Sequence, residues 1–293
     1  MKPAPFKYLV AESTEAAIAL KAEYGDEAKF LAGGQSLLPA MGFRLAAPAV
    51  LIDINPIAAL AYLRAEPAAT RIGALTRYRL LERDPLLARS QPLVTDALPN
   101  IAHVQIRNRT TIGGNLAHAD PASEMPAVVL ALNGRIHLRS TQGARAIAAE
   151  AFFTGTLATT LNAIEMLVEV ELPIAPARTG FAFLELARRQ GDFAMMGVAV
   201  SVQFDEHGLC RAARLAYCNA GDVPLLAQKA AQSLIGERVS EAHMRDAGSI
   251  ARTEIRPLGN VHATPAFQRH LAGVLTRRAL AIACERARAG DRQ

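Results

Sequence analysis

The sequence predicts a mixed α/β protein of three domains, and three observations carry this prediction. Residues 5–54 alternate strand-like and helical runs, as α/β units do. The segment PIAPARTG at 173–180 is rich in Pro and Gly, which predicts a linker. Beyond the linker, strand-like runs come first and helical patterns finish the chain. We therefore expect domains at 1–56, 57–175 and 178–293.

The first predicted domain is a strand–helix–strand unit. PFKYLVA at 5–11 reads as a strand, and STEAAIALKAEYG at 13–25 reads as a helix with a Ser/Thr cap and a terminal glycine. AKFLA at 28–32 and AVLIDI at 49–54 are further strands. The pair Asn55–Pro56 marks the boundary.

The middle domain is predicted to mix short strands with helices. The expected strands are 61–66 and 70–75 as a hairpin, 135–140 and 165–173; the expected helices are 76–88 and 126–134. Pro126 suits a first helical turn, and Asn133–Gly134 suits a helix end. In the last strand, alternation predicts that one face carries Met166, Val168, Val170 and Leu172.

The last domain is predicted to be a small antiparallel sheet followed by helices. Its expected strands are 181–187, 196–204 and 209–218, the last two joined by a hairpin turn at DEHG. Thr264–Pro265 predicts the start of the final helix. Phe267, Leu271 and Val274 share a stripe that we expect to be buried.

Composition excludes several classes of function. The chain has 293 residues, of which 51% are hydrophobic, yet no apolar run approaches the roughly 20 residues of a membrane span. The N-terminus lacks the pattern of a signal peptide, so we expect a cytoplasmic protein without membrane insertion. The net charge is +5, but the 27 arginines and five lysines are interleaved with acids and Trp is absent, which disfavours nucleic acid. Three scattered cysteines predict buried thiols rather than metal ligands.

Two glycine loops are the candidate ligand-binding motifs. In AGGQS at 32–36, glycines let the backbone curl so that successive N–H groups face one anion. A second pair, Gly113–Gly114, lies among Thr111, Asn115 and Ser123 and precedes a predicted helix. Loops of this kind on two lobes suit a bridging diphosphate, and a downstream carboxylate, Glu124, suits a ribose. Two unrelated glycine turns remain the alternative.

The two motifs, AGGQSLLPAM and TIGGNLAHADPASEMPA, resemble the paired FAD signatures of the flavin subunits of molybdenum-containing hydroxylases. This family includes the medium subunit of aerobic carbon monoxide dehydrogenase and the flavin domain of xanthine dehydrogenase. LARRQGDFAMMGVAV at 186–200 and TPAFQRHLAGVLTRRAL at 264–280 extend the resemblance over essentially the whole chain. It implies a PCMH-type FAD-binding fold of two α/β subdomains plus a C-terminal domain of antiparallel sheet and helices.

The resemblance implies FAD as the cofactor and assigns positions to it. The first loop would wrap the diphosphate, the second would meet the diphosphate and flavin side, and the acid would meet the ribose of the AMP half. Two apolar residues would flank the cofactor, and an aromatic would lie near the flavin ring. The implied cofactor-binding residues are Ala32, Gly33, Gly34, Gln35, Ser36, Leu37, Ile101, Thr111, Ile112, Gly113, Gly114, Asn115, Glu124, Leu167 and Phe193.

One position departs from the family pattern. Many members have a lysine where this chain has Glu185, and a cation there would favour a negatively charged reduced flavin. We therefore leave Glu185 out of the predicted site. Our hypothesis is that Glu185→Lys would raise the flavin reduction potential.

No catalytic or metal-binding residue is predicted in this chain. His118 and Asp120 are better explained by a turn than by an acid–base pair, and His103 is as well explained by a structural role as by lining the cofactor cavity. The resemblance implies that substrate is oxidised at a molybdenum cofactor on a large subunit. Electrons would then cross [2Fe-2S] clusters on a small subunit and reach an external acceptor through FAD.

The implied assembly is a dimer of heterotrimers. Two alternatives stay open at this point: a free-standing flavoprotein oxidoreductase, and a non-redox nucleotide-binding or assembly protein.

Overall fold

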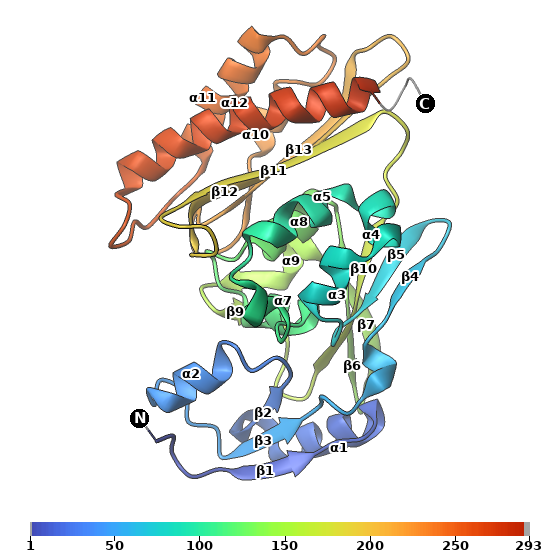
Figure 1. The fold of residues 1–293 in the computed structure, drawn as a ribbon, viewed down its shortest axis with the longest axis vertical. Coiled ribbons are helices and arrows are strands. Elements are labelled where there is room, and N and C mark those ends of the chain that lie inside the picture. Colours follow the sequence, from blue (N-terminus) through green and yellow to red (C-terminus); the bar gives the residue numbers. More distant parts are fainter. Residues whose placement is uncertain (1, 290–293) are drawn as a thin grey trace.

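The computed structural model describes residues 2–289, which form three tiers along the long axis (Figure 1). The N-terminal tier and the C-terminal tier lie at opposite ends, with a helix-rich tier between them. Within residues 2–289, no helix is both long enough and apolar enough to cross a bilayer.

The first tier is a parallel three-stranded sheet in the order β1-β3-β2. Its elements are β1 (Lys7–Val10), α1 (Thr14–Tyr24), the 3₁₀ turn η1 (Gly25–Glu27), β2 (Ala28–Leu31), α2 (Leu37–Gly42), β3 (Val50–Asp53) and η2 (Ala58–Leu60). As predicted, Ser13 caps α1, because its Oγ accepts a hydrogen bond from Ala16 N at 3.1 Å. Ile18 of α1 and Ile52 of β3 are buried in the core of this tier.

The second tier is an antiparallel five-stranded sheet in the order β4-β5-β10-β6-β7, covered by short helices. Its strands are β4 (Leu63–Ala65), β5 (Ala69–Gly73), β6 (Arg135–Ser140), β7 (Gly143–Ala148) and β10 (Met166–Pro173), with a separate pair β8 (Phe153–Gly155) and β9 (Ala158–Thr159). Its helices are α3 (Tyr78–Arg83), α4 (Pro85–Ser90), α5 (Pro92–Ala97), η3 (Leu98–Asn100), α6 (Val104–Arg107), α7 (Ile112–His118), α8 (Glu124–Ala131) and α9 (Ala149–Phe152).

The single helix predicted at 76–88 is wrong, because the structure breaks it into α3 and α4. Pro85 has no N–H to donate, and the Asp84 side chain accepts hydrogen bonds from Leu86 N at 2.8 Å and Leu87 N at 3.3 Å. Asp84 therefore starts a new helix with proline in its first position.

The prediction that Met166, Val168, Val170 and Leu172 share one face of β10 is also wrong, although all four are buried. The pairing of β10 with β6 shifts register between Leu167 and Glu169, so a bulge interrupts the strict alternation. Met166 and Val168 consequently join the core of the first tier, whereas Val170 joins the core of the second. This strand thereby connects the two tiers.

The third tier is an antiparallel sheet in the order β11-β12-β13-β14 with helices on one face, and α5 and α8 of the second tier approach its other face (Figure 1). Its elements are β11 (Thr179–Ala187), β12 (Ala194–Phe204), β13 (Cys210–Cys218), β14 (Leu225–Leu226), α10 (Gln228–Gln232), α11 (Glu241–Glu254) and α12 (Pro265–Ala289). The hairpin predicted at 205–208 is confirmed, because β12 and β13 pair antiparallel across it.

The predicted buried stripe of the last helix is confirmed at Leu271 but is wrong at Phe267, and Val274 is only half-buried. Phe267 is 41% exposed, whereas Gln268, Leu271 and Leu275 face the sheet. The Gln268 side chain donates to Met195 O at 2.9 Å, so this polar residue is anchored inside the core. A pattern based on hydrophobicity alone does not predict that a polar residue such as Gln268 is buried.

Candidate cofactor site

The first glycine loop presents a run of free backbone donors. The β2 ladder ends at Leu31, whose carbonyl accepts from Ile54 N at 3.1 Å. Within residues 2–289, the N–H groups of Gly33, Gly34, Gln35 and Ser36 donate to no protein acceptor. Gly34 has φ +75°, which curls the loop. Donors that follow one another in this way suit an anion such as a diphosphate.

The second glycine loop is bonded internally. Thr111 caps α7, with its Oγ1 accepting from Gly114 N at 3.2 Å. Gly113 N donates to Ala74 O at 2.9 Å, and a Cβ on Gly113 would lie 2.6 Å from Ala74 Cβ. The run of four free donors therefore belongs to the first loop, whereas the N–H groups from Ile112 to Asn115 in the second are all bonded within the protein.

The structure brings the two loops into contact. A Cβ on Gly33 would lie 2.6 Å from Arg109 O and 3.1 Å from Thr110 Cα. A Cβ on Gly114 would lie 3.7 Å from Ala32 Cβ. The bare Cα of Gly33 is therefore what allows the backbones of the first and second tiers to meet.

Two side chains that the sequence did not single out, those of Arg77 and Asn55, hold this junction. Arg77 donates to both Arg109 O and Asn55 Oδ1, and Asn55 Nδ2 donates to Leu31 O at 3.2 Å. Burial, followed by the neighbouring Arg109, lowers the pKa of Arg77. Asn55 was interpreted only as a domain boundary, and Arg77 only as part of a helix. The positive charge of Arg77 and Arg109 favours an anion beside the first loop.

Glu124 is connected to the second loop through its neighbour. Asn115 and Ser123 exchange hydrogen bonds of 2.8 and 3.1 Å, and Glu124 is the first residue of α8. The Glu124 side chain is 3% exposed. Burial, together with the charge of Asp120, raises its pKa to about 7. A carboxyl in this position has no cationic partner among the described residues.

The other predicted residues lie in different surroundings. Ile101 and Leu167 are buried in the core of the second tier, at 5% and 6% exposure, whereas Phe193 is 64% exposed. The loop before Phe193 packs against the segment after Ile101, since a Cβ on Gly191 would lie 2.6 Å from His103 Nδ1. Their contact with a cofactor stays a prediction.

The turn predicted at Asp120 is confirmed, because its Oδ1 accepts from Ala122 N at 2.9 Å. All three cysteines are buried, also as predicted.

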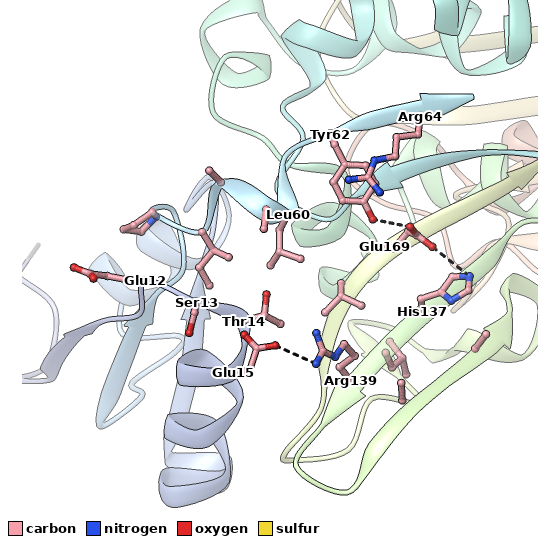
Figure 2. A pocket seen from close by; sticks show the side chains of 18 of the residues that line it. Glu12, Ser13, Thr14, Glu15, Leu60, Tyr62, Arg64, His137, Arg139 and Glu169 are labelled. Atoms are coloured by element: carbon pink, nitrogen blue, oxygen red, sulfur yellow. Dashed lines mark hydrogen bonds and ion pairs between the residues drawn. The ribbon is translucent and has the colours of Figure 1, made fainter. Parts of the chain in front are cut away.

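A separate cleft of about 830 Å³ lies between the start of α1 and the open face of the second sheet (Figure 2). Its lining includes Thr14, Glu15, Tyr62, His137 and Glu169, and no residue of either glycine loop. Figure 2 shows Glu15 paired with Arg139 across it.

Two of the cleft residues, His137 and Glu169, form a group with metal-ligand chemistry together with the neighbouring Glu171. However, Arg71 Nη1 lies 2.6 Å from Glu169 Oε1 and 3.1 Å from Glu171 Oε2. Tyr62 also donates to Glu169 at 2.6 Å. A guanidinium therefore occupies the place of a cation, and we interpret the group as an ion-pair network.

Comparison with known proteins gives matches along the chain. Residues 4–175 match the family described as FAD binding domain in molybdopterin dehydrogenase. Residues 181–283 match the CO dehydrogenase flavoprotein C-terminal domain.

The relatives and solved structures cover nearly the whole chain. The 6-hydroxypseudooxynicotine dehydrogenase complex subunit alpha of Paenarthrobacter nicotinovorans is 39% identical, covering 98% of this chain and 97% of that protein. The caffeine dehydrogenase subunit beta of Pseudomonas sp. (strain CBB1) is 37% identical with the same coverage. A structure of carbon monoxide dehydrogenase from Hydrogenophaga pseudoflava has a TM-score of 0.95 at 36% identity, covering 98% of this chain and 99% of that one.

Proposed function

This chain belongs to the family of FAD-binding medium subunits of molybdenum hydroxylases, and on that premise we propose that it carries electrons from [2Fe-2S] clusters of a small partner subunit to an external acceptor. FAD suits this role because the isoalloxazine accepts electrons singly and passes on one or two. The protein's part is to bind, orient and tune it.

The observation that carries this proposal is the junction of the two glycine loops. The four free N–H groups at Gly33 to Ser36 provide donors for a diphosphate, and the nearby guanidinium groups of Arg77 and Arg109 provide favourable charge. Thr111 to Asn115 would form the opposite wall, and Glu124 would accept hydrogen bonds from ribose hydroxyls. The residues present therefore fit a dinucleotide such as FAD.

The partners follow from what the chain contains. Its three cysteines are all buried and belong to the third tier, so they do not supply the ligand quartet of an iron–sulfur cluster. We propose that a small subunit holds the clusters, that a large subunit holds the molybdenum cofactor, and that the complex is a dimer of heterotrimers. Substrate would bind to the large subunit.

Removal and restoration of FAD tests the electron path without knowledge of the substrate. The complex would be purified from its native host, stripped of FAD, and reduced anaerobically with stoichiometric dithionite. We expect its clusters to be reoxidised slowly by NAD⁺, a quinone or oxygen, and rapidly by at least one of them once FAD is restored. Equal reoxidation by each acceptor with and without FAD would contradict the proposed path.

A further inference from the structure

Two acidic side chains lie near the place where α8 packs on β12 and β13, and the charge of one acts on the other. Glu185 lies two residues before the end of β11, opposite Gly197 of β12. A Cβ on Gly197 would lie 3.3 Å from Glu185 Cβ and 2.6 Å from Cys218 Sγ, so Glu185 and Cys218 flank that glycine. The charge of Glu124, at the start of α8, acts on both Glu185 and Cys218. The two groups therefore lie in one partly buried region, in which Glu124 is buried and Glu185 is half-buried.

No basic side chain neutralises this region. The ion pairs formed within residues 2–289 include neither Glu124 nor Glu185. The Glu185 Oε2 atom is buried and has no hydrogen-bond partner there, and the same holds for the Tyr78 hydroxyl of α3. The remaining titratable groups that act on the two carboxyls or are acted on by them are Asp120, Tyr78 and Cys218, none of which is a cation.

Two ionised carboxylates in such a place repel each other and lack solvation. Burial, followed by the charge of Glu124, raises the pKa of Glu185 to about 8. Burial also raises the pKa of Glu124 to about 7. Because the two groups interact, their protons leave in steps that belong to the pair rather than to either residue. Near neutral pH the pair therefore holds a proton that solvent-exposed carboxyls have lost.

The pair is connected to the candidate cofactor site. Glu124 follows Ser123, whose hydroxyl exchanges hydrogen bonds with Asn115 of the second glycine loop. A change of charge on a ligand held by that loop therefore acts on Glu124 through a region of low dielectric, in which electrostatic coupling is strong.

We propose that Glu124 and Glu185 form a redox-linked proton site, which binds a proton when the neighbouring cofactor is reduced and releases it on reoxidation. The inference rests on the proposed function, because the cofactor is taken to be FAD. Two-electron reduction adds two negative charges, which protons on the isoalloxazine offset in part. The pair takes one further proton from water, and reoxidation returns that proton, so the carboxyls are unchanged over the cycle. The electrons come from the partner's clusters, or from dithionite in the test.

Two measurements test the inference on the holo-complex and on Glu185→Gln. Infrared spectroscopy of the oxidised protein should show a protonated carboxyl band that disappears as the pH rises through about 7 to 8 and is weakened in Glu185→Gln. The pH dependence of the flavin midpoint potential should show an inflection in the same range, which the variant loses. Glu206→Gln, in an exposed turn with a 74% exposed side chain, is the matched control and should keep both signals.

The outcomes separate the two claims. A complex that retains FAD but lacks the band at pH 6, or that keeps the inflection in Glu185→Gln, would overturn this inference alone. A complex purified without FAD would overturn the proposed function and, with it, the redox link.

Discussion

Adding one methyl group at Gly33 should separate the two glycine loops. In Gly33→Ala, the new Cβ would lie 2.6 Å from Arg109 O, and real Cβ atoms essentially never approach another heavy atom closer than 3.0 Å. The obstacle is backbone, which cannot rotate away as the end of a side chain does. The first loop therefore has to move by about 0.4 Å or more relative to Arg109 and Thr110.

The size of the effect follows from the cost of overpacking, which is about 1–3 kcal/mol for an added methyl group in a well-packed place. If the N–H groups of the first loop move away from the diphosphate, FAD affinity falls by about 5- to 150-fold. If the displacement is taken up elsewhere, the same cost appears as lost stability instead. A bulkier change, such as Gly33→Val, should abolish flavin retention.

The assay is reconstitution of the apo-protein with FAD, followed by flavin fluorescence, together with urea unfolding of the same apo-protein. Gly155→Ala is the matched control, because its new Cβ would be 3.8 Å from Ala158 Cβ and its φ is not left-handed. Wild-type FAD affinity in both Gly33→Ala and Gly33→Val would refute the assignment of this loop to the diphosphate.

Three further predictions concern charged residues. Glu185→Lys should raise the flavin reduction potential, because a cation favours the reduced cofactor; a redox titration without a shift would exclude this effect. Arg107→Met should lower stability by about 1.5–3 kcal/mol in urea unfolding, because the guanidinium donates to Glu82 and to Ile101 O at 3.0 Å, while Glu82 keeps its ion pair with Arg79; an unchanged midpoint would contradict it. Glu124→Gln should remove a pH dependence of apo-protein stability. The carboxyl pKa rises from 4.5, its ordinary value, to about 7 in the folded protein. The free energy of unfolding is therefore highest below pH 4.5 and falls as the pH rises through about 7, by roughly 3 kcal/mol at most. Urea unfolding at pH 5 and pH 8 should therefore give a smaller difference for the variant.

Local signals predicted the elements that depend on local chemistry. The Ser13 cap and the helix end at Gly25 could be predicted from the sequence, because their hydrogen bonds join residues that are close in the chain. The bulge at Val168 could not be predicted from the sequence, because it arises from the pairing of β10 with β6 and from the packing of β10 on two cores. Gln268 likewise became a core residue only through a long-range bond to Met195.

The same distinction applies to the candidate site. Glycine pairs identified both loops, but the motif did not reveal that the run of free donors lies at the first pair, while both glycine N–H groups of the second are bonded. Arg77 and Asn55 carry no local pattern, since their bonds cross from one tier to another. The pairing of Glu124 with Glu185 was equally hidden, because 60 positions of sequence separate them and only the packing of the third tier brings them together.

The most direct test of the central claim is a visible absorption spectrum of this chain, tagged and isolated gently from its native host. We predict flavin bands overlaid on broad iron–sulfur absorption, together with two co-purifying chains. A colourless protein would contradict the account, and flavin bands on a lone chain would contradict the proposed complex.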